Sequence, residues 1–230
     1  MNEGPERTPA TLKRRRVAGS VMEVDPFGVA SELTSAARLR AASALRDLGH
    51  LLVAHQPNDA TFDAIAEWAA AMKEQLATTP PRREALIEAR VAHLASRAKN
   101  PLATTDRPNG SLFADSFVSG RANPMGINAV MSVDGDHSVA HVTIESAFEG
   151  APGRSHGGVV AALIDETMGG VLGIINELAF TGWLKVTYRN PTPMHVPLEC
   201  RAWLEHRNGR KLALRSEVRD GEQLIVEAEA

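Results

Sequence analysis

The chain reads SHGGVVAALIDE from Ser155 to Glu166, and this stretch decides the fold. It opens with a His-Gly-Gly sequence and continues as an apolar helix that carries two neighbouring acids, Asp165 and Glu166. Glycine at a helix start lets another molecule approach the backbone, and the free N–H groups there favour negative charge. A carboxylate among apolar residues costs stability unless it is paired or used in chemistry. The stretch therefore predicts an oxyanion-stabilising helix start combined with a buried general base.

The residues around this stretch predict an α+β domain. We expect the helix over residues 157–175, with an apolar face formed by Val160, Leu163, Ile164, Thr167, Met168, Val171 and Leu172. After residue 116 the hydrophobic period changes from 3.6 to 2, which indicates strands near 127–133, 138–146, 182–190, 199–207, 210–219 and 223–229. Asn208-Gly209 and Asp220-Gly221 are typical hairpin turns between the last three strands. One long helix and a meander of antiparallel strands predict a sheet wrapped round a central helix.

The first hundred residues have a different pattern and predict an α-helical extension. Apolar residues recur at helical spacing from about 30 to 54, from about 59 to 76 and, more weakly, over 82–98. Asn58 or Asp59 can cap the second of these helices. We expect four parts along the chain: a disordered tail (1–28), the helical extension (29–99), a linker (100–116) and the folded domain (117–230).

Composition excludes several classes of function. The chain has 230 residues, 43% of them hydrophobic, and a net charge of −3, so we expect neither nucleic acid nor an anionic membrane as a partner. No run approaches the ~20 apolar residues of a membrane-spanning helix, so we expect no membrane insertion. The single cysteine, Cys200, is expected to be buried on a strand and suits a cytoplasmic protein. The eight histidines lack metal-ligand spacing, so we predict neither a metal site nor a cofactor.

Three residues carry a family resemblance: His156, Asp165 nine positions later, and Thr181 sixteen positions after that. Together with GRANPM at 120–125 and YRNPTP at 188–193, this pattern resembles the hotdog-fold acyl-CoA thioesterases of the PaaI-like and 4-hydroxybenzoyl-CoA thioesterase-like groups. The resemblance covers about residues 110–230. It implies a hotdog fold with a helical N-terminal extension, and an enzyme that hydrolyses the thioester of a fatty or aryl acyl-CoA to the free acid and coenzyme A.

Thioester hydrolysis needs a polarised carbonyl and either an activated water or a carboxylate nucleophile. The backbone N–H groups of Gly157 and Gly158 point out of the predicted helix start and can polarise the carbonyl. Asp165 can act as general base or attack directly. The resemblance matches Asp165 to the family's catalytic acid and gives its neighbour and rival, Glu166, a structural hydrogen bond. His156 either contacts the thioester or fixes the helix start.

The resemblance also implies contacts to the nucleophilic water and to coenzyme A. Related enzymes have Ser or Thr at the position of Thr181, where the hydroxyl holds the nucleophilic water. Cationic side chains suit the phosphates of coenzyme A. An alignment without gaps from Asp165 onward puts the coenzyme contacts at Thr187, Arg189, Arg210 and Lys211. One departure from the pattern is Gly150, where some relatives have an asparagine, so we expect no asparagine-assisted polarisation of the carbonyl.

The spacing of the two catalytic elements predicts a shared site. Asp165 lies eight residues after Gly157, which is roughly 12 Å along a helix axis at ~1.5 Å per residue. The helix start and the acid of one chain are therefore too far apart to flank one carbonyl. Two antiparallel helices across an interface would bring Asp165 of one subunit near Gly157 of the other. We therefore expect a homodimer, or a dimer of dimers, with sites at the subunit interface.

A second hypothesis is a non-catalytic regulator, in which the hotdog domain senses acyl-CoA and the helical module reads DNA. Residues 30–99 contain nine Lys/Arg and eight Asp/Glu, so this module lacks the basic footprint expected for DNA. A sensor also has no need of an acid in the central helix. We therefore favour the enzyme. Its acyl preference stays open, with Met168, Leu172 and Trp183 as candidate lining residues.

Overall fold

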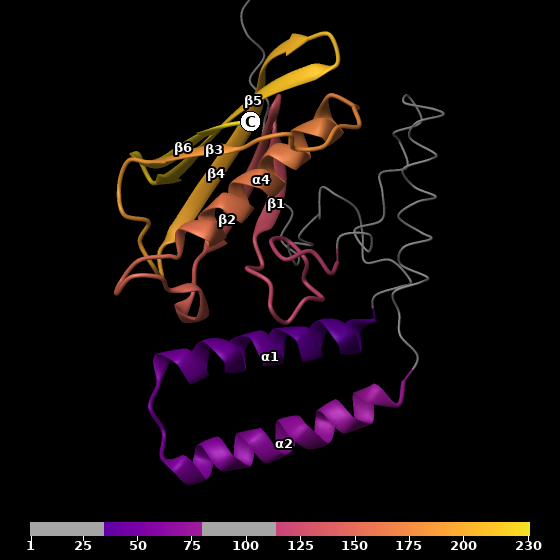
Figure 1. The fold of residues 1–230 in the computed structure, drawn as a ribbon, viewed down its shortest axis with the longest axis vertical. Helices are drawn as coiled ribbons and strands as arrows, with labels where there is room; N and C mark the ends of the chain where they lie inside the picture. The colour runs from indigo at the N-terminus through magenta and orange to yellow at the C-terminus, as the bar shows by residue number, and fades with distance from the viewer. Residues whose placement is uncertain (1–34, 80–113) are drawn as a thin grey trace, which may run out of the picture.

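The computed structural model describes residues 35–79 and 114–230, which form an antiparallel sheet with a long helix on one face and two helices beyond it (Figure 1). The sheet has the strand order β1-β2-β4-β5-β6-β3. Its strands are β1 (Val130–Asp134), β2 (His137–Thr143), β3 (Lys185–Tyr188), β4 (Pro197–Asn208), β5 (Lys211–Asp220) and β6 (Gln223–Glu229). Helix α4 (Gly157–Ile174) packs against β2, β4 and β5. The predicted α+β fold class is confirmed.

The core lies between α4 and the sheet. The helix buries Val160, Leu163, Ile164, Thr167, Met168 and Val171, which are the residues of the predicted apolar face except Leu172. By length and composition alone α4 is apolar enough to cross a membrane, and its buried face against the sheet accounts for that apolarity. Cys200 of β4 is completely buried, and burial raises the pKa of its thiol to about 11. The cysteine is therefore a core residue, as its strand pattern predicted.

Local signals in the sequence set most of the element boundaries. The Asn58 side chain accepts a hydrogen bond from the Thr61 N–H at 2.9 Å and caps α2 (Asp59–Ala77), as predicted. Gly209 and Gly221 have φ values of 58° and 56° at the two predicted hairpin turns. A non-glycine residue adopts this left-handed backbone at a cost, so the glycines fix where β4 turns into β5 and β5 into β6.

Three predicted strands are shorter in the structure than their sequence patterns. The first begins at Val130 rather than near 127, β2 ends at Thr143 rather than near 146, and β3 spans only Lys185–Tyr188 instead of 182–190. After β3 the backbone N–H groups of Arg189 and Asn190 both bond to the Ile225 carbonyl, which ends the regular ladder with β6. The predicted tail (1–28), the third helix (82–98) and most of the linker lie outside the described residues.

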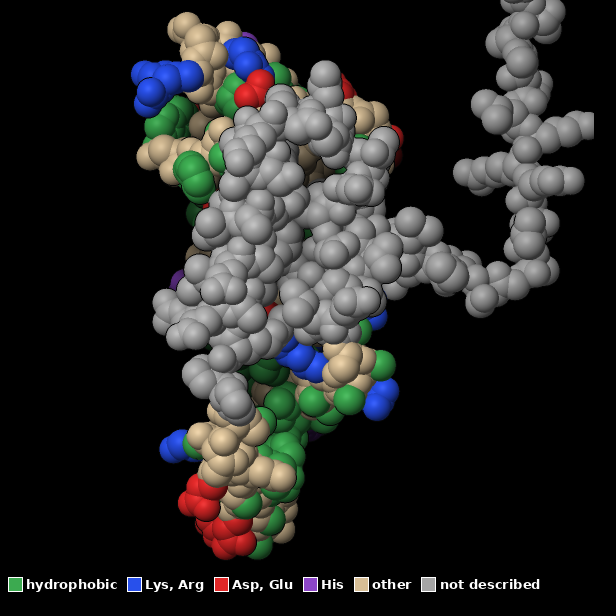
Figure 2. Space-filling view, turned by 90° about the vertical axis from the view of Figure 1, so that its right-hand side faces the viewer, with side chains coloured by type: hydrophobic (Ala, Val, Ile, Leu, Met, Phe, Trp, Pro, Cys, Tyr) green, Lys and Arg blue, Asp and Glu red, His purple; other side chains and the backbone are tan. Residues whose placement is uncertain are grey.

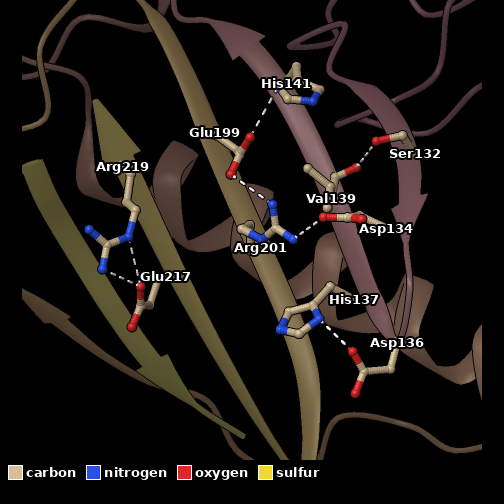
Figure 3. Close-up of polar contacts among 10 residues, drawn as sticks. All are labelled: Ser132, Asp134, Asp136, His137, Val139, His141, Glu199, Arg201, Glu217 and Arg219. Carbon is tan, nitrogen blue, oxygen red and sulfur yellow. Dashed lines mark hydrogen bonds and ion pairs between the residues drawn. The ribbon is translucent and has the colours of Figure 1, made fainter. Parts of the chain in front are cut away.

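The sheet face opposite α4 carries ion pairs of Arg201, one within β4 to Glu199 and one to Asp134 of β1 (Figure 3). Arg201 of β4 reaches across β2 to Asp134 of β1, and this hydrogen bond holds the pKa of the Asp134 carboxyl below its usual range. The stem of Arg201 lies opposite Val139, which is only 2% exposed although it is on this outer face. Exposed ion pairs contribute about 0–1 kcal/mol each, so the core carries most of the stability.

The two N-terminal helices differ in how they contact the body. Helix α1 (Ala36–Ala54) buries Ala42 and Arg46 and contacts the short 3-10 helix η2 (Ser146–Phe148). Helix α2 has no buried residue, and Leu76 is 68% exposed. Figure 2 shows hydrophobic side chains gathered at the lower end of the molecule, where these two helices lie. The extension is thus attached to the described body through α1.

Candidate active site

The start of α4 is capped by its own histidine. Nδ1 of His156 accepts a hydrogen bond from the Gly158 N–H at 3.0 Å, and the His156 N–H donates to the Phe148 carbonyl at 2.9 Å. Two roles were open for His156, and in the structure it has the second of them, which is to fix the helix start. The Gly158 N–H, which we predicted to help polarise the carbonyl, donates to this cap. The Gly157 N–H, at the first helical position, has no intrahelical acceptor and is the other donor of the predicted pair.

A tyrosine holds the glycine at the helix start. The Tyr188 hydroxyl donates to the Gly157 carbonyl at 2.6 Å, from the end of β3. A Cβ atom on residue 157 would lie 3.1 Å from the Tyr188 hydroxyl oxygen, closer than side chains normally pack, so any larger residue here would have to displace the tyrosine side chain. Partial burial raises the pKa of Tyr188 above its ordinary value, which keeps the hydroxyl protonated as a donor. The sequence pattern did not indicate this role.

The predicted pair Asp165 and Thr181 is brought together. The Thr181 hydroxyl donates to Oδ1 of Asp165 at 2.8 Å. The expectation that Asp165 is buried is wrong for the single chain, in which it is exposed. The physical reason is helical geometry, because Ile164 faces the sheet and the next residue is rotated by about 100° from it. The carboxylate is therefore held by a threonine on the open side of α4.

Glu166 has a different environment from its neighbour. Its Oε1 accepts hydrogen bonds from the Ser119 N–H, at 3.1 Å, and from the Ser119 hydroxyl, while Oε2 accepts one from the Ser116 hydroxyl. Glu166 thus makes the structural hydrogen bonds that the resemblance implied. It ties α4 to the segment that precedes β1.

We expect Glu166→Gln to lower the free energy of unfolding by about 2 kcal/mol. The substitution replaces one of the two acceptor oxygens with an NH₂ group, so one serine hydroxyl loses its acceptor and faces another donor. Denaturant-induced unfolding followed by tryptophan fluorescence measures this loss. The matched control is Asp165→Asn on the adjacent, exposed position, which should change stability by no more than about 0.5 kcal/mol. Equal stability of Glu166→Gln and the wild type, together with lost hydrolysis, would instead identify Glu166 as the base.

The predicted coenzyme contacts do not gather in one chain. The side chain of Arg189 pairs with Glu227, with Nε donating to Oε1 at 3.1 Å, and Thr187 lies opposite Glu227 in the β3–β6 ladder. Arg210 and Lys211 are exposed at the β4–β5 turn. The turn end of this hairpin lies near the C-terminal end of α4, where Arg207 bonds to Glu177. Helix α4 has 18 residues, about 27 Å at ~1.5 Å each, so this hairpin is far from Gly157.

The surface around Asp165 is apolar and open. Phe180 and Trp183, on either side of Thr181 in the sequence, are 84% and 60% exposed. Large exposed apolar patches mark binding or interaction surfaces. Within residues 35–79 and 114–230, no three His, Cys, Asp or Glu side chains lie close enough together to hold a metal ion. Among the described groups, the Asp165 carboxylate is a candidate proton acceptor and the start of α4 a candidate donor to a carbonyl oxygen.

The part of the chain that builds this site is similar to known thioesterases. Residues 153–227 match the family model of the thioesterase superfamily. The chain is 32% identical over 83 residues to acyl-coenzyme A thioesterase THEM4 of Xenopus laevis, and 34% identical over 85 residues to that of Mus musculus. Each alignment covers 36% of this chain, and the chain spans only 37% and 36% of the two relatives. The resemblance to the thioesterase superfamily is thus confirmed for this region.

A solved structure of a thioesterase superfamily protein extends the likeness to the helices. It superposes with a TM-score of 0.68 and 22% identity, covering 85% of this chain and 94% of that one. Residues 114–230 are only about half of the chain, so a superposition of this extent includes residues of the helical extension as well. The likeness shows the fold, a hotdog with N-terminal helices, as predicted.

Proposed function

We propose that this protein is an acyl-CoA thioesterase, which hydrolyses the thioester of a fatty or aryl acyl-CoA to the free acid and coenzyme A. The observation that carries the proposal is the hydrogen bond from Thr181 to Asp165 on the open side of the central helix. It orients a carboxylate without burying it, which is what a general base needs to reach a water molecule. The match to the thioesterase superfamily over residues 153–227 supports the same reaction.

In the proposed reaction Asp165 removes a proton from water while the water oxygen attacks the thioester carbon. Thr181 bonds to Oδ1, so we assign Oδ2 as the oxygen that takes this proton. The developing negative charge on the carbonyl oxygen is stabilised by the Gly157 N–H at the positive end of α4. The carbon–sulfur bond then breaks, and the proton held by Asp165 passes to the leaving coenzyme A thiolate, which restores the carboxylate. Direct attack by Asp165 on the thioester carbon is the alternative route.

We further propose that each site is shared between two subunits. The roughly 12 Å between Gly157 and Asp165 along α4 prevents one chain from flanking a carbonyl with both. The exposed Phe180 and Trp183 next to Thr181 provide apolar surface for an interface or for an acyl chain. In such an assembly Thr187, Arg189, Arg210 and Lys211 are the residues that we assign to coenzyme A.

Release of free thiol from a panel of acyl-CoA substrates tests the proposal. The panel runs from acetyl-CoA to palmitoyl-CoA and includes phenylacetyl-CoA, so it also reports whether the acyl group is short, long or aromatic. We expect turnover with at least one member, at a kcat within the range of about 1–1,000 per second that is typical of enzymes. Binding of acyl-CoA without turnover would refute the enzyme and favour the sensing regulator.

A further inference from the structure

Helix α1 contacts the loop before the active-site helix through a histidine. Nδ1 of His50 accepts a hydrogen bond from the Ala147 N–H at 3.1 Å, and its ring packs edge-to-face on Phe148 at a centroid distance of 5.3 Å. Both partners belong to η2. These contacts join residues that are 97 positions apart in the chain. His50 is therefore the link between the helical extension and η2.

The loop that His50 holds is bonded directly to the helix start. The carbonyl of Phe148 accepts the hydrogen bond from the His156 N–H, and His156 in turn caps α4 with its side chain. A change in the position of η2 is thus passed through one hydrogen bond to the cap, and through the cap to the Gly157 N–H. A second route from α1 runs through Arg38 and Asp115 to Ser116, which bonds to Glu166, but it does not reach the start of α4.

We propose that His50 is a positioning residue for the start of α4 and that it acts only as the neutral imidazole. Acidification then releases the C-terminal end of α1, which carries His50. The hydrogen bond requires an unprotonated Nδ1, because an imidazolium has two donors and no acceptor. Protonation would place an N–H opposite the Ala147 N–H. The consequence for catalysis rests on the proposed thioesterase function, whereas the release of α1 does not.

The charges facing His50 come from both sides of the contact. Burial is the largest influence and lowers the pKa of His50 below its ordinary value of about 6.5. Arg46 on α1 and His195 on the body act in the same direction, while Asp47 and Glu145 favour the cation. Nδ1 of His195 lies 2.9 Å from Oε2 of Glu145, so this carboxylate is shared between the two imidazoles of the cluster.

The sign of the pH dependence follows from that lowered pKa. A histidine with a lower pKa in the folded state binds fewer protons when it is docked. The docked contact is therefore fully favourable above about pH 6.5 and is lost as the pH falls through the lowered value. Two other contacts of α1, from Arg38 to Asp115 and from Arg46 to the Asn123 carbonyl, rest on arginine, which keeps its charge throughout this range. We therefore expect local release at the His50 end.

Amide hydrogen exchange of the full chain between pH 5 and pH 8 tests the contact directly. The protection factor of the Ala147 N–H, corrected for the intrinsic pH dependence of exchange, should fall about five- to tenfold on acidification, as expected for losing one hydrogen bond. In His50→Asn the side-chain Oδ1 takes the place of Nδ1 and cannot titrate, so protection should stay high and flat. His50→Ala should lower it at every pH. Protection that is independent of pH in the wild type, or unchanged in His50→Ala, would overturn the proposal.

His195→Asn is the matched control for the nearby imidazole. Its φ of 60° suits asparagine, and the variant removes the second imidazole of the cluster. The wild-type pH response of Ala147 should persist in it, and loss of the response would assign the switch to His195 and refute the role of His50.

Activity measurements then separate positioning from simple packing. We expect His50→Ala to lower kcat for thioester hydrolysis with little change in KM, and His50→Asn to restore it and to move the acidic limb of the pH profile. If no acyl-CoA is hydrolysed while Ala147 behaves as predicted, the thioesterase proposal fails and the docking switch stands. If turnover is normal in all variants while Ala147 exchange responds, the positioning role fails.

Discussion

Replacement of Asp165 by asparagine is expected to lower kcat for thioester hydrolysis by between about 100-fold and about 10,000-fold, the contribution typical of a positioned general base. Asparagine keeps the shape of the side chain and an oxygen that accepts the Thr181 hydrogen bond, but it cannot take a proton from water. Because Asp165 is exposed in the chain, the free energy of unfolding should change little. Thiol release measured beside denaturant unfolding checks both statements.

Thr181 supplies the matched pair of controls for this experiment. Thr181→Ser keeps the hydroxyl that bonds to Asp165 and should retain most of the activity, whereas Thr181→Val keeps the size and removes the hydrogen bond. A rate in Asp165→Asn equal to that of the wild type would eliminate Asp165 as the base. The three hydrogen bonds from Ser116 and Ser119 to Glu166 would then have to be reconciled with a catalytic role for that residue.

Mixed dimers provide the second large effect, because they determine which chain supplies each half of the site. Asp165→Asn and Gly157→Val should each be nearly inactive, the latter because its side chain displaces Tyr188 and obstructs the helix start. Co-expression with two affinity tags allows the heterodimer to be purified. In a shared-site dimer it contains one site with both groups intact, so its activity should recover to about half that of the wild type.

The arrangement of the substitutions supplies the control. When Asp165→Asn and Gly157→Val are placed on the same chain and paired with a wild-type chain, both shared sites lose one group and the dimer should be inactive. The opposite pattern, with activity only in the second pairing, would show that each chain uses its own helix start and acid. A monomer by light scattering at assay concentrations would contradict the shared site before any variant is made.

Much of the fold could be predicted because its signals are local. Glycines at 209 and 221 set the hairpins, and Asn58 caps the residues that immediately follow it. The apolar spacing of α4 predicted its start at Gly157 and its buried face, apart from Leu172. The family resemblance indicated Thr181 as the residue that holds the nucleophilic water, whereas its hydrogen bond to Asp165, 16 residues away, is seen only in the structure.

Other parts of the site depend on contacts that no local pattern records. Ser116 and Ser119 meet Glu166 across about fifty positions, and Tyr188 meets Gly157 across 31. Serines in an irregular segment, or a tyrosine at a strand end, have no periodicity that marks them as partners. The cap formed by His156 also reassigned the Gly158 N–H, because the direction of an imidazole depends on its three-dimensional surroundings.

By itself the sequence determined the order of the elements, their turns, the apolar face of the central helix and the pair of acids beside it. These properties follow from the preferences of residues close together in the chain and from hydrophobic periodicity. Only the tertiary structure decided that the Asp165 side chain is exposed and that Glu166 is hydrogen-bonded to Ser119. It also decided that His50 of the extension contacts the loop before α4. Such choices depend on which surfaces meet when the chain folds, since neighbouring residues on one helix face different partners about 100° apart.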